Sequence, residues 1–432
     1  MKEEPVMKRR TLSLALALSL LLCACSGSGV TALKTDGASP PVVAAKDDAL
    51  DQALGDFGTE LLRQTRREGE NTLLSPLSIL FCLSMCANGA GGDTLAEFEA
   101  LLAGAGDLEG LNANCRDLLE TSRLLTEGDP ARSELYGITP GESTLSIANS
   151  LWLDKRVRAE DAFVGLCTGS YEAGLFSADF TQDGTRKEIN RWISDNTGGH
   201  IKEALSSIDP STVLALVNAV YFEGKWAKNF DPDFTAENRD FHLEDGSTAP
   251  VDLMINGSRT ERYIHTGQEQ GVLLPYTDGR LAFLALLPPE GTALTDYLNT
   301  LDGARLTGLI TGAEEEEILL LLPKFTAYWQ GSLVEPLKAM GLEQAFDPER
   351  ADFSGMGTGE NGYPLYLNAV EHGAGIEVDE QGTKAFAFTF VGVAGGGAAP
   401  QLEELCLDRP FVYGIVDMER GIPLFLGTFE TP

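Results

Sequence analysis

A hydrolase that relies on a histidine base could draw on only four histidines in this chain, His200, His242, His265 and His372. The sequence has no nucleophile elbow of the Gly-any-Ser-any-Gly type, no zinc-binding His-Glu-any-any-His helix and no phosphate-binding loop. A catalytic triad that uses His372 is the one enzymatic alternative that these residues leave. We therefore expect neither a metal nor a cofactor, and a protein that is not itself an enzyme.

A different reactive group, a peptide bond offered to another protein, is indicated near the carboxyl end. About thirty residues separate Val378 from Arg409, more than an ordinary connection needs, which favours an exposed functional loop. Its first part alternates with a period of two, as a strand does, and a run of glycines follows. One face carries the small side chains of Thr383, Ala385, Ala387 and Thr389, and the other carries Lys384, Phe386, Phe388 and Phe390. Such a loop could serve as bait.

The same segment resembles the hinge and reactive-centre loop of a serpin, and shorter motifs along the chain agree with that resemblance. It covers residues 47–432. Many matches in the family's order over so long a stretch make chance a poor explanation. The motifs are residues 71–79 (NTLLSPLSI), 149–153 (NSLWL), 189–201 (INRWISDNTGGHI), 216–226 (LVNAVYFEGKW), 322–325 (LPKF), 340–342, 351–356, 409–411 and 423–427.

The resemblance implies an α+β fold with three β-sheets, eight or nine α-helices and an exposed reactive-centre loop at roughly residues 380–408. In this family a serine protease attacks the loop and forms an acyl-enzyme, and the cut loop then inserts into the large sheet as an extra strand, which distorts the protease. The inward face of the hinge must be small enough to slide between two strands. The hinge residues implied here are Glu380, Gly382, Thr383, Ala385, Ala387 and Thr389.

Two further groups take their roles from the resemblance. Trp226 is expected near the point where the hinge enters the large sheet. His372 is expected to pair with Asn218, close to Ser75 and Ser78 and beneath the middle of that sheet, in a network that controls its opening. A loop that never inserts stays open as an alternative. The chain would then be a non-inhibitory serpin that acts as a surface-tethered binding protein.

The residues alone leave the attacked bond open. Counting forward from Glu380 by the family's usual spacing gives Gly396, counting back from Pro410 gives Ala399, and Gly397 and Ala398 lie between. All four residues are small, so a shallow elastase-like pocket fits them better than a trypsin-like or a wide aromatic pocket. Subtilisin-like serine proteases and papain-like cysteine proteases stay open as targets.

The amino terminus is typical of an exported protein. A basic cluster at residues 8–10 precedes an apolar run at 12–22 that is too short to span a bilayer comfortably, which indicates a signal peptide. Residues 22–25 (LCAC) resemble a bacterial lipobox, in which Cys25 is lipidated and holds the protein at the outer face of a membrane. Ordinary cleavage and free secretion are the alternative. The expected division is a signal peptide at 1–25, a flexible tether at 26–46 and the serpin domain at 47–432.

The composition fits one large domain. Of the 432 residues, 43% are hydrophobic and 22% charged, which is enough to bury a sizeable core. The net charge of −33 at pH 7 makes nucleic acids and anionic lipid surfaces poor partners, so the lipid anchor is the only membrane contact expected. We expect a monomer. The cysteines that remain after Cys25 are odd in number and are expected to be buried small side chains or free thiols: Cys82, Cys86, Cys115, Cys167 and Cys406.

Hydrophobic periodicity indicates the elements that would position these residues. Helical spacing predicts helices at residues 50–67, 78–88 and 188–196. The acidic run at 314–317 is expected to be a solvated turn. Helices mostly precede strands, which places the chain in the α+β class. Strands are predicted at residues 145–153, 213–222, 318–325, 411–417 and 424–429.

Overall fold

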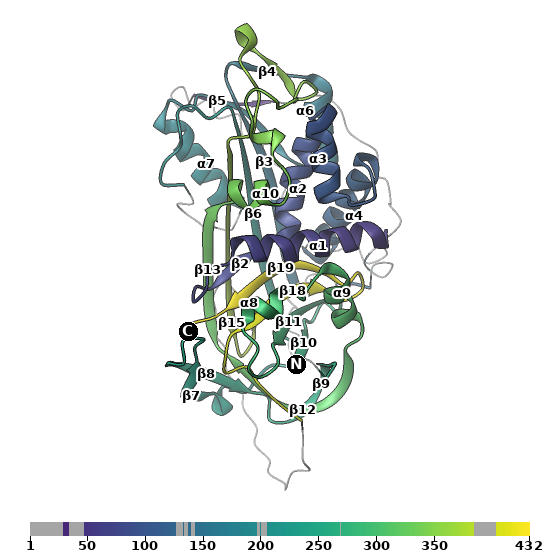
Figure 1. Ribbon diagram of the computed structural model, residues 1–432, viewed down its shortest axis with the longest axis vertical. Helices are drawn as coiled ribbons and strands as arrows, with labels where there is room; N and C mark the ends of the chain where they lie inside the picture. The colour runs from purple at the N-terminus through teal and green to yellow at the C-terminus, as the bar shows by residue number, and fades with distance from the viewer. Residues whose placement is uncertain are drawn as a thin grey trace, which may run out of the picture.

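The computed structural model describes residues 29–33, 47–126, 133, 137–139, 143–196, 199, 205–267, 269–383 and 403–432. In this part of the chain, three β-sheets and nine α-helices form an elongated α+β structure (Figure 1). None of the helices in these ranges combines the length and the apolar composition needed to span a membrane. The helices are α1 (Asp48–Thr65), α2 (Pro76–Ala87), α3 (Gly92–Leu102), α4 (Leu108–Thr126), α6 (Asp161–Ser170), α7 (Asp183–Asn196), α8 (Leu294–Leu298), α9 (Gly303–Thr311) and α10 (Val334–Ala339).

The seven-stranded sheet has the strand order β1-β5-β3-β6-β16-β15-β13. Two long antiparallel pairs form its body. One pairs β3 (Ser143–Asp154) with β6 (Leu214–Lys225), and the other pairs β15 (Ala369–Asp379) with β13 (Phe325–Ser332). The short strands are β1 (Val30–Leu33), β5 (Gly174–Ala178) and β16 (Gly382–Thr383).

The second sheet has ten strands, in the order β2-β19-β18-β11-β10-β9-β12-β8-β7, with β17 added parallel to β12. Its central strands β11 and β18 are buried on both faces, which explains why they read as continuous apolar runs. A third sheet pairs β4 (Val157–Ala159) with β14 (Gly357–Gly359). The ten strands are β2 (Thr72–Leu74), β7 (Ala236–His242), β8 (Thr248–Ile255), β9 (Arg259–His265), β10 (Gln270–Pro275), β11 (Leu281–Leu287), β12 (Glu314–Pro323), β17 (Glu403–Cys406), β18 (Phe411–Asp417) and β19 (Ile422–Phe429).

Helix α2 lies in the core between the two large sheets. All of its residues are buried, and it contacts β3 and β6 of one sheet and β19 of the other. Ser75 caps its first turn, since its hydroxyl oxygen accepts the backbone N–H of Ser78 at 3.3 Å, and Pro76 follows where no N–H is needed. Cys82 and Cys86 are buried free thiols, and burial raises the pKa of Cys82 far above its ordinary value. They are packing residues, as the sequence predicts.

The predicted helices and strands are present, most of them with slightly different ends. The prediction for residues 314–317 is wrong. This acidic run is the first part of β12, where residues 314–318 pair antiparallel with β9, so backbone pairing with a neighbouring strand replaces a turn. The predicted tether at 26–46 also differs, because Val30–Leu33 form β1 and pair with β5. Apart from Gly29 and β1, residues 26–46 lie outside the described part of the chain.

Candidate functional site

The chain turns back into the seven-stranded sheet immediately after β15. The carboxylate of Asp379 accepts the backbone N–H groups of Gln381 (2.7 Å) and Gly382 (3.0 Å), which closes a tight turn. Strand β16 follows at once and pairs antiparallel with both β15 and β6. The hinge therefore begins as a short strand held between two long ones.

Gly382 is required where the hinge passes β6. A Cβ atom at this position would lie 2.1 Å from the carbonyl oxygen of Gly224 and 2.9 Å from the Cα atom of Lys225. Both are backbone atoms of a paired strand, which cannot move aside without breaking the ladder. Any larger residue at position 382 would push β16 away from β6.

Thr383 points into the protein. It is 2% exposed, and its Oγ1 lies 2.6 Å from the hydroxyl oxygen of Tyr276. Burial raises the pKa of Tyr276 well above its ordinary value, so the phenol stays neutral and can share its proton with Thr383. The other predicted hinge, bait and lipid-anchor residues lie outside the described residues: Ala385, Ala387, Thr389, Gly396, Gly397, Ala398, Ala399 and Cys25.

Trp226, at the end of β6, holds the turn from the side of the core. Its indole N–H donates to the carbonyl oxygen of Asp379 at 2.8 Å, and its backbone N–H donates to that of Gln381 at 3.0 Å. Its ring stacks on Tyr276, with ring centroids 5.0 Å apart and planes 10° apart. Trp226 thus contacts the turn directly and reaches Thr383 through Tyr276.

An ion pair fixes the outer side of the turn. The carboxylate of Glu380 accepts hydrogen bonds from the Lys324 ammonium and the Thr235 hydroxyl, each at 2.9 Å. Burial raises the pKa of Glu380, but the bonds from Lys324 and Thr235 outweigh burial, and the pKa is lowered from its ordinary value. The Lys324 side chain is 45% exposed, so solvent weakens the pair. Glu380 is therefore ionised at neutral pH and joins the turn to the start of β13.

Between β16 and the Leu214 end of β6, strands β6 and β15 are incompletely paired. Within the described residues they pair with each other only where Ala215 and Leu216 lie opposite Ala369 and Val370. Residues 217–223 of β6 and 371–377 of β15 lie between that pairing and β16. A cavity of about 30 Å³ lies at the end of this interval that is farther from β16. It is lined among others by Asn218, His372 and Tyr328. It has room for about one water molecule.

His372 is buried at this cavity and is tied to the start of α2. Its Nε2 accepts the backbone N–H of Ser75 at 3.1 Å, and burial lowers its pKa to about 4, so the imidazole is neutral at pH 7. The Ser78 hydroxyl bonds the side-chain oxygen of Asn218, whose amide donates to Asn149 at 2.6 Å. Within the part of the chain that the structure describes, no hydrogen bond joins His372 to Asn218 directly. The two residues are connected through the first turn of α2.

The catalytic alternative for His372 lacks a nucleophile. The Ser75 hydroxyl donates to the carbonyl oxygen of Leu424 at 2.8 Å, and Ser75 offers His372 its backbone N–H instead. A triad needs the hydroxyl to face the imidazole. In the described ranges, no group of three His, Cys, Asp or Glu side chains is placed to hold a metal ion. The hinge is therefore the candidate functional site.

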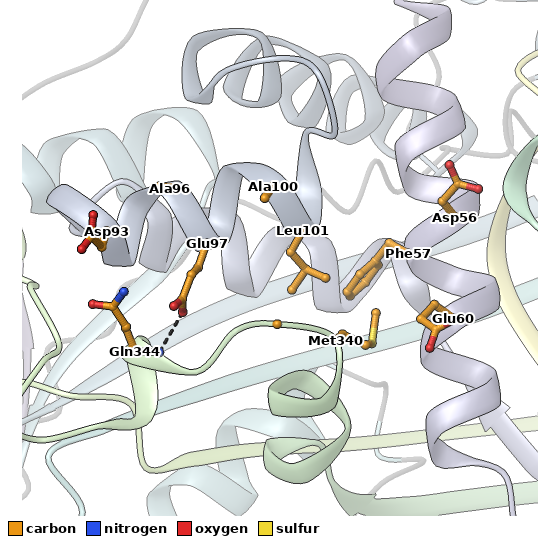
Figure 2. A pocket seen from close by; sticks show the side chains of 11 residues that line it. Asp56, Phe57, Glu60, Asp93, Ala96, Glu97, Ala100, Leu101, Met340 and Gln344 are labelled. Carbon is orange, nitrogen blue, oxygen red and sulfur yellow. Dashed lines mark hydrogen bonds between the residues drawn. The ribbon is translucent and has the colours of Figure 1, made fainter.

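A separate hollow lies between α1, α3 and the turn after α10 (Figure 2). It is open, measures about 690 Å³ and includes the apolar side chains of Phe57, Leu101 and Met340. Glu97 reaches across it and accepts the backbone N–H of Gln344 at 2.7 Å, as Figure 2 shows. None of the residues that line it belongs to β6, β15 or β16. This hollow is thus independent of the hinge.

Three contacts of the hinge were not found from the sequence. Tyr276 lies 107 residues from Thr383, while Thr235 and Lys324 lie 145 and 56 residues from Glu380. Only Lys324 carried a signal, because it is part of the motif LPKF at residues 322–325.

Comparison with known proteins identifies the same architecture. The sequence model of the family described as "Serpin (serine protease inhibitor)" matches residues 52–432. Serpin B6 of Macaca fascicularis is 32% identical over 404 residues, which are 89% of this chain and 100% of that protein. The structure of tengpin, a thermophilic serpin, superposes with a TM-score of 0.82 in its native state, at 31% identity over 91% of this chain and 97% of that one. Its latent state gives 0.74, at 30% identity over 90% and 98%. Thyroxine-binding globulin in complex with thyroxine shares the fold at 24% identity, with a TM-score of 0.74 over 89% and 99% of the two chains.

Proposed function

Because this chain belongs to the serpin family, we propose that it traps a serine protease through its exposed loop. The protease would attack a loop bond and form an acyl-enzyme. The cut loop would then enter the seven-stranded sheet between β6 and β15, carry the attached protease along the sheet and distort its active site. New strand hydrogen bonds and new apolar burial would supply the free energy.

One observation carries this proposal: β16 already lies between β6 and β15. Gly382 allows the close approach to β6, and the buried Thr383 hydroxyl is satisfied by Tyr276. Beyond β16, toward the Leu214 end of β6, the two long strands next pair with each other at Leu216 and Val370. The hinge thus occupies the first positions of a strand that the rest of the loop could complete.

The register of β16 gives a definite path for insertion. Thr383 lies opposite Gly224 of β6 and opposite Val378 of β15, both antiparallel. Extending this register places residues 384–390 beside 217–223 and 371–377. Thr389 would then lie between Asn218 and His372, at the cavity of about 30 Å³. Since side chains alternate along a strand, Ala385 and Ala387 would share its inward face.

Loop cleavage tests the trapping proposal. A non-target protease that cuts once between residues 393 and 399, as checked by mass measurement, should raise the unfolding temperature substantially, because the free end can then complete the sheet. The uncut protein, scanned at the same rate, is the reference. An unchanged melting curve after confirmed cleavage would rule out trapping. That result would favour the alternative, a surface-tethered binding protein with a static loop.

The loop composition supports an elastase-like target. Gly396, Gly397, Ala398 and Ala399 offer small side chains that suit a shallow pocket, and subtilisin-like or papain-like proteases are the other candidates. Incubation with a panel of these proteases, followed by denaturing electrophoresis, identifies the partner. The mass of the released carboxy-terminal peptide identifies the attacked bond.

We further propose that the protein is exported as a monomer and held at the outer face of a bacterial membrane by a lipidated Cys25. The basic and apolar residues at 8–22 and the small residue before Cys25 support this location. Cys25→Ala should release the protein into the medium or leave an unprocessed precursor. Membrane retention of a fully processed Cys25→Ala variant would contradict the proposal.

A further inference from the structure

Strand β1 extends the outer edge of the seven-stranded sheet. It pairs antiparallel with β5, with Val30 opposite Ala178 and Leu33 opposite Leu175. Just before it, the carbonyl oxygen of Gly29 accepts the backbone N–H of Asp179 at 3.0 Å. Val30 and Leu33 also pack against the apolar core. The first described residues of the chain are therefore docked on the domain.

The start of β1 lies at the end of the sheet that is farthest from the hinge. Ala178, which pairs with Val30, also lies opposite Asp154 at the end of β3. The adjacent residue of β3 pairs with Leu214, where β6 begins, whereas Thr383 pairs with Gly224 near the end of β6. From Leu214 to Gly224 the strand rises about 33 Å. Figure 1 shows β5 toward one end of the molecule and β7, β8 and β12 toward the other.

We propose that β1 orients the protein on the membrane, with the β1 end of the sheet beside the bilayer and the hinge directed away from it. This inference rests on the proposed lipidation of Cys25. Only residues 26–28 would separate Cys25 from Gly29, so the chain can hold Gly29 no more than about 14 Å from the lipidated residue. If β1 were undocked, the first fixed residue would be Asp47, up to about 75 Å away along an extended chain.

Under this proposal, the short connection from Cys25 to β1, and not the charge of the protein, sets its orientation on the membrane. A net charge of −33 repels the protein as a whole from anionic headgroups. A soluble protease arriving from the medium would then meet the loop before the membrane. Loop insertion would later carry the acylated protease toward the Leu214 end of β6, so trapping should tilt the β1 end away from the bilayer.

Energy transfer to a membrane dye tests the orientation. The full chain would be produced in cells that process lipoproteins and reconstituted in phosphatidylethanolamine–phosphatidylglycerol vesicles that contain an acceptor lipid. A donor dye would be placed at Lys187→Cys, near the start of α7 at the β1 end, or at Glu237→Cys, two residues after the hinge contact Thr235. Both variants would carry Cys406→Ser, because Cys406 is the one cysteine among the described residues that is not fully buried.

We expect greater transfer from position 187 than from position 237. Thr31→Pro/Ala32→Pro should abolish the difference, since one of two adjacent strand prolines must remove an inward N–H from the ladder. A flexible Gly/Ser insertion after Ser28 should also abolish it while β1 stays intact. Ala38→Pro/Ser39→Pro, which changes the chain after β1, is the matched control and should preserve the difference.

Equal transfer from both positions in the parent chain, or a difference that survives both β1 disruption and linker extension, would overturn the inference. A parent chain that does not sediment with vesicles would overturn it together with the proposed anchor. Covalent complex formation with a protease, measured on the same samples, reports separately on the proposed trapping function.

Discussion

Replacing Thr383 by arginine should convert a trapping inhibitor into a substrate. Thr383 is 2% exposed, and its Oγ1 lies 2.6 Å from the Tyr276 hydroxyl, so the site has no space for a guanidinium group. An arginine must either leave the sheet or be buried without a partner. If the arginine leaves the sheet, β16 is lost in the uncut protein and loop insertion must then bury the charge. If the arginine stays buried, the unpaired charge weakens the pairing of β16 with β6 and β15.

The expected size of the effect follows from these contacts. Loss of the Thr383–Tyr276 hydrogen bond costs about 1 kcal/mol, and an unpaired buried charge costs about 3–5 kcal/mol. A barrier to insertion that is higher by about 4 kcal/mol slows insertion roughly 1,000-fold, because each 1.36 kcal/mol is a factor of ten. Hydrolysis of the acyl-enzyme is unaffected and should then be faster than loop insertion, so the protease is released active.

The assay compares trapping with turnover. Thr383→Arg would be mixed with the partner protease, and covalent complex, cleaved inhibitor and residual protease activity would be measured over time. Lys384→Arg, the neighbouring residue on the face predicted to point outward, is the matched control and should still form complex. A full yield of stable complex from Thr383→Arg would refute the assignment of hinge faces.

Three further predictions concern the hinge, the histidine and the loop. Gly382→Ala should lower the free energy of unfolding by about 1–3 kcal/mol in urea titrations because its Cβ would meet β6, whereas Gly308→Ala, with open space around it, should not. The His372 pKa of about 4 lies below the ordinary value near 6.5, so the unfolded chain binds the proton first. Stability should therefore fall between pH 6.5 and pH 4, by about 3 kcal/mol relative to His372→Gln; a difference that does not vary with pH would contradict this. Ala399→Arg, or Gly396→Arg if that is the attacked residue, should create trypsin inhibition, and failure of both would move the bond elsewhere.

Long elements could be predicted from the sequence because they carry their own periodicity. Helix α1 carries one apolar face, while α2 and strands β3 and β6 are apolar runs long enough to indicate buried elements. The two short strands could not be predicted in this way. β16 and β1 exist because each pairs with strands that are distant in sequence, and two or four residues contain no usable period.

The sequence predicted a position for the hinge but not the hydrogen bonds and contacts around it. Glu380 and Trp226 were singled out, while their partners Lys324, between β12 and β13, and Tyr276, directly after β10, come from distant parts of the chain. His372 was expected to pair with Asn218. In the described structure it instead accepts the N–H of Ser75, because the start of α2 brings that donor beside the imidazole. Such pairings depend on side-chain directions that periodicity does not specify.

Residues 384–402 connect two different sheets, and their number bears on how long the proposed inhibitor would keep its activity. The chain leaves the seven-stranded sheet at Thr383 and rejoins the fold in β17, which pairs with β12. Inserting residues 384–390 would move the chain about 23 Å along the sheet, and residues 391–402 can span about 40 Å on the way back. The loop could therefore fill the interval without being cut if the path back to β17 is no longer than this span. Under the proposed trapping function, loop length as well as loop sequence should therefore determine how long the uncut protein can still react with a protease.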